Sequence, residues 1–129
     1  MSYSRASRMV YNLGSITTTA STVTLPIRGP KGTQGRLIDV IARCTTTHVL
    51  GTTPTELDIG KAGATTAYGV FLPAAMTAPT ASTLTDLPGA SVLGSTVIPA
   101  DTVVLATTIA NVTGSPAGVI NYDVVIDWF

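Results

Sequence analysis

Residues 102–128, TVVLATTIANVTGSPAGVINYDVVIDW, contain the clearest structural pattern in this 129-residue chain. After Val119, apolar and polar side chains alternate, so that one face carries Ile120, Tyr122, Val124, Ile126 and Trp128 and the other carries Asn121, Asp123 and Asp127. A period of two indicates a β-strand with one buried face. Residues 113–118, TGSPAG, are typical of a turn. We therefore predict a long antiparallel hairpin formed by 102–112 and 119–128, with Tyr122 and Trp128 anchored in the core.

The preceding sequence is also typical of short strands separated by turns. Within 36–50 the same alternation places Ile38, Val40, Ala42 and Cys44 on one face and Asp39, Arg43, Thr45 and Thr47 on the other. Residues 17–27 predict an edge strand, because Pro26 cannot donate a hydrogen bond to a central ladder. Further strands are expected at 55–59 and 67–72. The Ala-, Pro-, Ser- and Thr-rich stretch 73–101 gives only short strand candidates, at 83–87 and 95–98.

These seven or eight predicted strands, without an amphipathic helix, indicate an all-β fold. We expect a single antiparallel β-sandwich over residues 17–129 that is jelly-roll-like. An immunoglobulin-like sandwich is the alternative, but the chain has one cysteine, Cys44, and so lacks the Cys…Trp…Cys signature. Residues 1–16 combine basic and large apolar side chains with no clean period. They predict an extended N-terminal arm that becomes ordered against a partner.

The composition favours a protein that makes contacts rather than one that performs chemistry. Charged residues are only 11% of the chain, and the net charge is zero. Residues 1–43 hold six basic residues and one acidic residue, whereas 44–129 hold one lysine and six acidic residues. This asymmetry predicts head-to-tail contacts or docking on an acidic partner, unless the fold intermixes the two sets. The scattered basic residues and few aromatics argue against nucleic acid binding. No apolar stretch of about 18 residues predicts a transmembrane helix.

Candidate catalytic groups are few and poorly placed in the sequence. His48 is the only histidine, no G-x-S-x-G motif accompanies it, and we expect it to be a half-exposed residue at a strand end. Cys44 is expected to be a buried, inert thiol. Glu56 and Asp58 share one strand face and could form an acid/base pair, but a solvated face or an inter-subunit salt bridge is favoured. We therefore predict no enzyme activity, no catalytic residues, no metal and no cofactor.

Three stretches together resemble a known family. They are PIRGPKGTQGRLIDV at 26–40, TELDIGKAG at 55–63 with Tyr68 following, and PADTVV at 99–104 continuing through PAGV at 116–119 to IDWF at 126–129. This pattern resembles the auxiliary capsid proteins of tailed bacteriophages, also called cement or decoration proteins. The resemblance covers most of residues 25–129, and its motifs are turns and strand ends rather than catalytic signatures.

The resemblance implies a structural virion protein, made in the host cytoplasm, that sits on the outer surface of an icosahedral capsid and bridges neighbouring capsomers. It implies two partners, the major capsid protein and further copies of this chain, usually as a homotrimer and sometimes as a dimer. No nucleic acid or membrane partner is expected. The capsid-contacting residues are predicted to be Arg5, Arg8 and Tyr11 of the arm, followed by Arg28 and Lys31 of the next loop. The alternative function is a carbohydrate- or host-binding module of a phage fibre, which needs an exposed aromatic platform.

Overall fold

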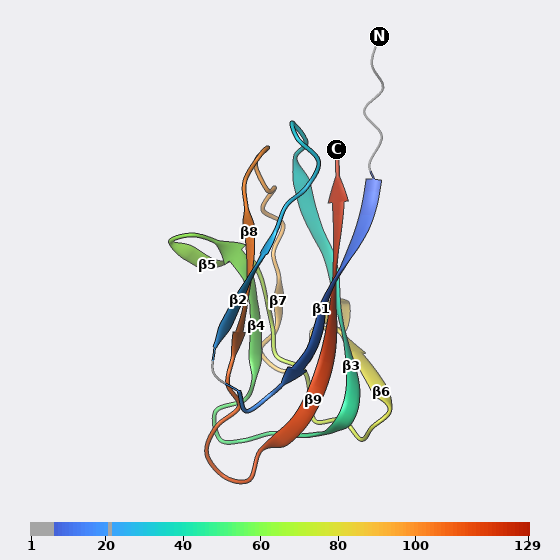
Figure 1. Cartoon of the computed structure of the whole chain (residues 1–129), viewed down its shortest axis with the longest axis vertical. Coiled ribbons are helices and arrows are strands. Elements are labelled where there is room, and N and C mark those ends of the chain that lie inside the picture. The colour runs from blue at the N-terminus through green and yellow to red at the C-terminus, as the bar shows by residue number, and fades with distance from the viewer. Residues whose placement is uncertain (1–6, 21) are drawn as a thin grey trace.

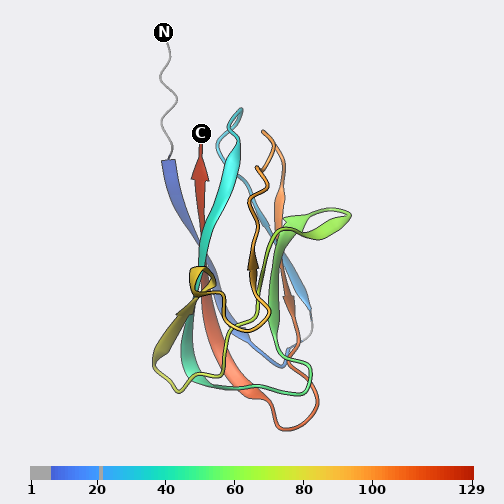
Figure 2. The same ribbon diagram turned by 180° about the vertical axis from the view of Figure 1, so that it is seen from behind.

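Two antiparallel sheets face each other in this structure, a computed structural model that describes residues 7–20 and 22–129 (Figures 1 and 2). The first sheet, sheet A, contains four strands in the order β1 (Ser7–Thr17), β9 (Ala117–Trp128), β3 (Gly35–Val49) and β6 (Thr80–Thr83). The second sheet, sheet B, contains five strands in the order β2 (Val23–Ile27), β8 (Val104–Ile109), β4 (Glu56–Lys61), β5 (Ala64–Phe71) and β7 (Val92–Leu93). The predicted all-β sandwich is confirmed.

The order of strands within the two sheets is jelly-roll-like. Strands β1, β3, β6 and β9 belong to sheet A, and each pair of successive sheet A strands is separated by a strand or strand pair of sheet B. The chain therefore crosses repeatedly between the sheets, as it does in a double Greek key. Strand β7 is an additional short strand at the edge beside β5. The Pro26-containing strand β2 lies at the other edge of sheet B, which confirms the predicted edge position.

Apolar side chains from both sheets fill the space between them. Every inward residue of β9 predicted to be in the core is buried, including the two anchors Tyr122 and Trp128. The Tyr122 ring meets Phe71 of sheet B edge to face, with ring centroids 6.2 Å apart. Such aromatic pairs contribute about 0.5–1.5 kcal/mol beyond the burial of their area. Each sheet therefore covers the apolar face of the other.

The predicted hairpin between 102–112 and 119–128 is wrong. Strand β8 pairs with β2 and β4 in sheet B, whereas β9 pairs with β1 and β3 in sheet A. The connecting residues cross from one sheet to the other instead of turning back within one sheet. Alternation identifies the face of a strand that is buried, but it does not identify the strand's neighbours, since both arrangements bury the same side chains.

The predicted N-terminal arm is also wrong for the residues that the structure describes. Ser7–Thr17 is strand β1, which pairs with β9 from Ser7 opposite Trp128 to Thr17 opposite Val119. The register shifts between Asn12 and Ser15, where Gly14 has a φ of +80°. This bulge interrupts the alternation of inward and outward side chains, so the sequence pattern does not indicate a strand. Residues 1–6, including Arg5, lie outside the described residues.

The poorly patterned stretch 73–101 adds little regular structure. It contains the short strands β6 and β7 and one 3₁₀ turn, η1 (Leu84–Asp86), so the strand candidate at 83–87 is a turn. In the candidate 95–98, Ile98 makes an isolated bridge with Gly35. Within the described residues, no helix is long and apolar enough to cross a membrane.

Candidate interaction site at the basic end

Exposed basic side chains gather at the end of the sandwich where β1 starts and β9 finishes, at the top of Figure 1. Arg8 lies near the start of β1, Arg28 and Lys31 lie in the loop between β2 and β3, and Arg36 follows at the start of β3. We call this region the basic end. It contains four of the five predicted capsid-contacting residues, Arg8, Tyr11, Arg28 and Lys31. The prediction missed Arg36, Trp128 and Asp101, which share this end with them.

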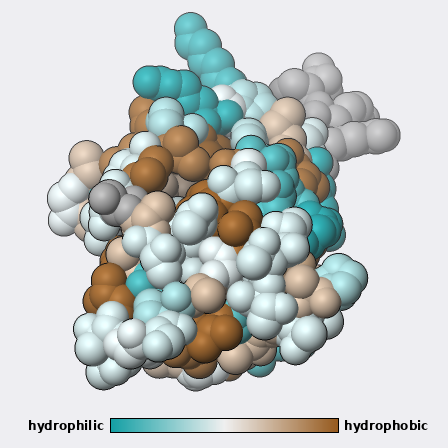
Figure 3. Space-filling model, turned by 60° about the horizontal axis from the view of Figure 1, so that its bottom comes forward, coloured by the Kyte–Doolittle hydropathy of each residue, from teal (hydrophilic) through white to brown (hydrophobic). Residues whose placement is uncertain are grey.

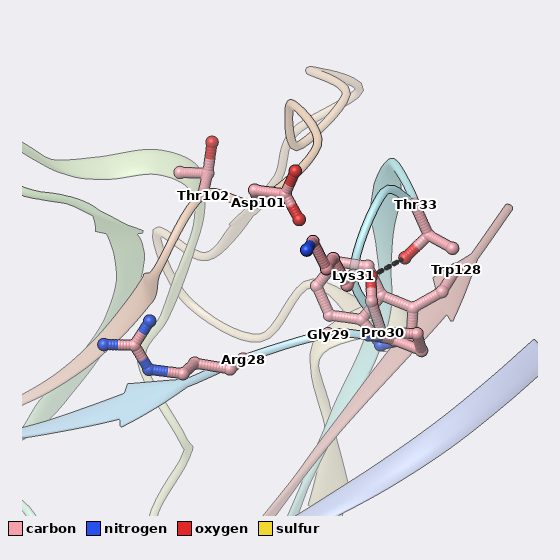
Figure 4. A pocket seen from close by; sticks show the side chains of 8 residues that line it. All are labelled: Arg28, Gly29, Pro30, Lys31, Thr33, Asp101, Thr102 and Trp128. Carbon is pink, nitrogen blue, oxygen red and sulfur yellow. Dashed lines mark hydrogen bonds between the residues drawn. The ribbon is translucent and has the colours of Figure 1, made fainter.

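The indole of Trp128 supports the loop that carries Arg28 and Lys31 (Figure 4). A Cβ atom at Gly29 would lie 2.5 Å from the ring, and one at Gly35 would lie 2.6 Å from it. Only glycine at these two positions allows the backbone to lie against the indole. The loop therefore rests directly on a buried aromatic ring, which fixes the path of its backbone.

Hydrogen bonds hold the same loop from its other sides. The Gly32 amide donates to Asp101 Oδ1 at 2.8 Å, and Thr33 Oγ1 donates to the Pro30 carbonyl at 2.6 Å. Two backbone hydrogen bonds join Gln34 to Phe129. Thr33 and Asp101, together with Arg28 and Trp128, help to line a pocket of about 210 Å³. The loop is thus a rigid platform and presents its cations from a fixed backbone.

Tyr11 supports this platform and does not project from it. Its hydroxyl accepts a hydrogen bond from Trp128 Nε1 at 2.8 Å and lies 3.3 Å from the Arg28 carbonyl, to which it can donate. The ring is partly buried against the core. Tyr11 therefore links β1, β9 and the β2–β3 loop, and it holds the backbone beside Arg28 in place.

Arg8 differs from Arg28 and Lys31 because it is already paired. Its guanidinium binds Asp127 through two hydrogen bonds, 2.8 Å and 3.1 Å long. These hydrogen bonds and the adjacent positive charge hold the pKa of Asp127 below its ordinary value. Arg28 and Lys31 form no ion pair with any residue that the structure describes, and the Arg28 side chain extends away from Trp128 in Figure 4. Within the described chain, these two cations are therefore not neutralised by an ion pair.

The charge asymmetry along the sequence is partly removed by folding. Arg8 pairs with Asp127, and Arg43 pairs with Asp123, so basic residues of the first third meet acidic residues of the last strand. Burial alone would raise the pKa of Asp123, but the hydrogen bond and charge of Arg43, with a hydrogen bond from Asn12, outweigh it and lower this pKa. The fold therefore brings basic residues of 1–43 next to acidic residues of 44–129 at these positions.

The opposite end of the sandwich carries no charge in its loops. Residues 17–20, 44–55, 72–79 and 109–118 contain no Asp, Glu, Lys or Arg. Figure 3 looks toward this end and shows mainly weakly polar and apolar surface. Asn111 makes the end rigid, because its side chain binds the Gly51 amide at 2.6 Å and the Val49 carbonyl at 2.7 Å. Uncharged surface of this kind is easily desolvated in a protein contact.

His48 is fully buried at this uncharged end, so its predicted half-exposure is wrong. It is 1% exposed and its backbone pairs with that of Met76. The Ala117 and Pro73 carbonyls approach the ring without forming a hydrogen bond of good geometry, and burial lowers the pKa of His48. Cys44 is buried, as predicted, and its thiol donates to the Thr46 carbonyl at 2.9 Å. Neither group is placed to attack a substrate in solution.

The Glu56–Asp58 pair lies on the outer face of sheet B, because Leu57 and Ile59 between and beside them face the core. Asp58 is only 4% exposed, so the predicted solvated face is wrong for this residue. Burial, followed by hydrogen bonding and repulsion from Glu56, raises the pKa of Asp58 to about 7. The Asp58 carboxyl therefore keeps its proton up to about neutral pH. Among the described residues no three His, Cys, Asp or Glu side chains cluster as metal ligands.

The large aromatic side chains are mostly buried. Tyr68, Phe71, Tyr122 and Trp128 all belong to the core, and Phe129 is the one clearly exposed aromatic residue of the described chain. This burial disfavours the fibre-module alternative, because glycan stacking needs an accessible aromatic face. No protein-family model, curated protein or solved structure was found to match the chain.

Proposed function

We propose that this chain is a structural protein of a bacteriophage virion, which binds the outside of the capsid and cements neighbouring capsomers as a homo-oligomer. The observation that carries the proposal is the basic end. There a loop fixed on Trp128 presents Arg28 and Lys31 without an intramolecular ion pair. An acidic surface on the major capsid protein would be attracted to these cations and oriented by them.

Repetition of weak contacts is the mechanism that we propose for cementing. An exposed ion pair contributes only about 0.2–1 kcal/mol, so one chain binds a capsid weakly. Copies joined in an oligomer bind together, and the second contact forms at a high effective concentration. The resemblance to cement proteins favours a trimer, with a dimer as the alternative. The uncharged end offers a further surface for such contacts.

The test is binding to shells assembled from the major capsid protein of the same genome. The double variant Arg28→Ala/Lys31→Ala is compared with Lys61→Ala, which removes an exposed lysine outside the β2–β3 loop, at the end of β4. At roughly 0.5–1 kcal/mol for each lost contact, the double variant is expected to bind about 5- to 30-fold more weakly per subunit. The control variant should sediment with shells as the wild type does.

Two results would contradict the proposal at different levels. If the double variant decorates shells as well as the wild type and the control do, Arg28 and Lys31 are not capsid contacts. If the wild-type protein does not bind the shells at any salt concentration, the capsid function itself is wrong. Added salt should weaken wild-type binding, because exposed ionic contacts are screened within about 10 Å at 0.1 M.

A further inference from the structure

Strand β1 leaves the longest unprotected edge of the sandwich. It is an edge strand of sheet A, and no described strand pairs with its outer side. The other edges are poor templates for pairing: β6 has four residues, β7 has two, and β2 contains Pro26. A long edge strand with free N–H and C=O groups readily adds a further strand, and proteins usually blunt such edges with charge or proline.

The regular part of this edge, Ser7–Asn12, lacks those protective features. It contains no proline, and its one charged side chain, Arg8, is held by Asp127 of the neighbouring strand. Val10 is 60% exposed, more than any other large apolar side chain in the described chain, and Met9 is 40% exposed. The bulge around Gly14 ends the regular edge. An apolar segment of six residues is thus free to pair.

A groove lies beside this edge on the open side of the sandwich. It has a volume of about 410 Å³ and runs between β1 and β2, where Val10, Leu13, Leu25 and Pro26 contribute to its lining. A strand added to β1 would cover part of this apolar surface as well as complete the hydrogen bonds of the edge.

We propose that β1 pairs antiparallel with β1 of a second copy of this chain, about a two-fold axis at Val10. Sheet A then becomes one continuous eight-stranded sheet across the two copies, since each contributes four strands. The self-pairing is supported by the match of side chains around this axis. Val10 faces its own counterpart, Met9 faces Tyr11, and Arg8 faces Asn12 rather than another arginine.

Other registers match less well. Residues opposite each other in an antiparallel pair share a face, so a two-fold axis must pass through a residue and not between two residues. An axis at Arg8 would oppose two guanidinium groups, which is destabilising. An axis at Val10 places the most exposed apolar side chain at the centre of the contact. The net charge of zero also allows two copies to approach without overall repulsion.

This inference goes beyond the capsid proposal and does not rest on it. The resemblance to cement proteins favours a homotrimer. Pairing of β1 with β1 instead gives a dimer, because it occupies the β1 edge of both copies and leaves none free for a third. The mass of the oligomer therefore separates the two expectations. Shell binding can fail while the pair forms, and the pair can fail while shell binding persists.

The first experiment measures mass by light scattering over a series of protein concentrations. The wild-type mass is expected to approach twice the 13.2 kDa of one chain. Val10→Lys places two ammonium groups opposite each other and should keep the protein at 13.2 kDa. Val92→Lys is the matched control, because Val92 is equally exposed on the short edge strand β7. Thermal unfolding of both variants checks that they remain folded.

The second experiment traps the contact covalently. Opposed residues in an antiparallel pair have Cα atoms about 4.5–5.5 Å apart, within the span of a disulfide. Val10→Cys should therefore yield a disulfide-linked dimer when an oxidant is added, whereas Val92→Cys should not. Native Cys44 is buried and does not compete. A wild-type monomer, a trimer, or a dimer unaffected by Val10→Lys and not trapped by Val10→Cys would overturn the inference.

Discussion

Replacing Asp58 by asparagine is expected to stabilise the protein above neutral pH. The side chain is buried on the outer face of sheet B beside Glu56, and one of its oxygens, Oδ1, has no hydrogen-bond partner. Its pKa in the folded state is about 7, compared with an ordinary value of 3.8. The folded protein therefore holds more protons than the unfolded chain between these pH values, so stability falls as pH rises through this range.

The size of the effect follows from the same two pKa values. The difference between 3.8 and about 7 corresponds to an upper limit of about 4 kcal/mol, at about 1.36 kcal/mol for each pH unit. Solvent close to the outer face of the sheet screens part of this energy, so we expect ionised Asp58 to destabilise the folded protein by roughly 2 kcal/mol. Asparagine has nearly the same shape and cannot ionise. The free energy of unfolding of Asp58→Asn should thus exceed that of the wild type by roughly 2 kcal/mol at pH 8 and by much less at pH 4.

Urea unfolding at pH 4, 5, 6, 7 and 8 measures this difference directly. Subtracting the wild-type free energy of unfolding from that of Asp58→Asn at each pH removes the contributions of other titrating groups. Glu56→Gln is the companion variant. It removes the partner's charge but leaves the burial of Asp58, so its pH-dependent gain should be smaller than that of Asp58→Asn. A difference between wild type and Asp58→Asn that stays constant from pH 4 to pH 8 would refute the reasoning.

Three further outcomes can be measured by the same unfolding experiments. Asn111→Ala should lower the free energy of unfolding by about 2–4 kcal/mol, because the Gly51 amide and the Val49 carbonyl lose their buried hydrogen-bond partner. The control Val112→Ala changes an exposed neighbouring residue and should alter the free energy of unfolding little. The free energy of unfolding of the wild type should fall as the pH drops below about 6.5, whereas that of His48→Gln should not fall for this reason. Burial lowers the pKa of His48 in the folded protein, so the unfolded chain takes up the proton at a higher pH. Deleting residues 1–14 should leave the protein insoluble or unfolded, because most of β1 is removed from β9; a soluble, cooperatively folded deletion variant would contradict the role of β1 in the sheet.

Side-chain alternation in the sequence was sufficient to predict the fold class and much of the core. The inward residues of 119–128, the buried thiol of Cys44 and the edge position of the Pro26 strand all agree with the structure. These features depend on which face of one strand is apolar, or on one residue's ability to donate a hydrogen bond. Both are local properties, and a single sequence contains them.

The basic end was only partly predictable. Arg8 was identified as a basic residue of the N-terminal arm, and Arg28 and Lys31 as basic residues of the next loop. Nothing local indicates that Arg8 is neutralised by Asp127, 119 positions away. Similarly, Tyr11 has no sequence signal for its hydrogen bond with Trp128. The glycines at 29 and 35 were a possible signal for close backbone packing, but the indole against which they pack is supplied by the last strand.

The sequence by itself determined that this chain forms β-strands, which of their faces are apolar, and that its few charges are unevenly spread. Only the tertiary structure decided that β8 and β9 belong to different sheets, that β1 is part of the sandwich, and that His48 and Asp58 are buried. The physical reason is that strand pairing and burial arise between segments far apart in the chain. Many pairings bury the same apolar faces, and the choice among them depends on the packing of the whole molecule.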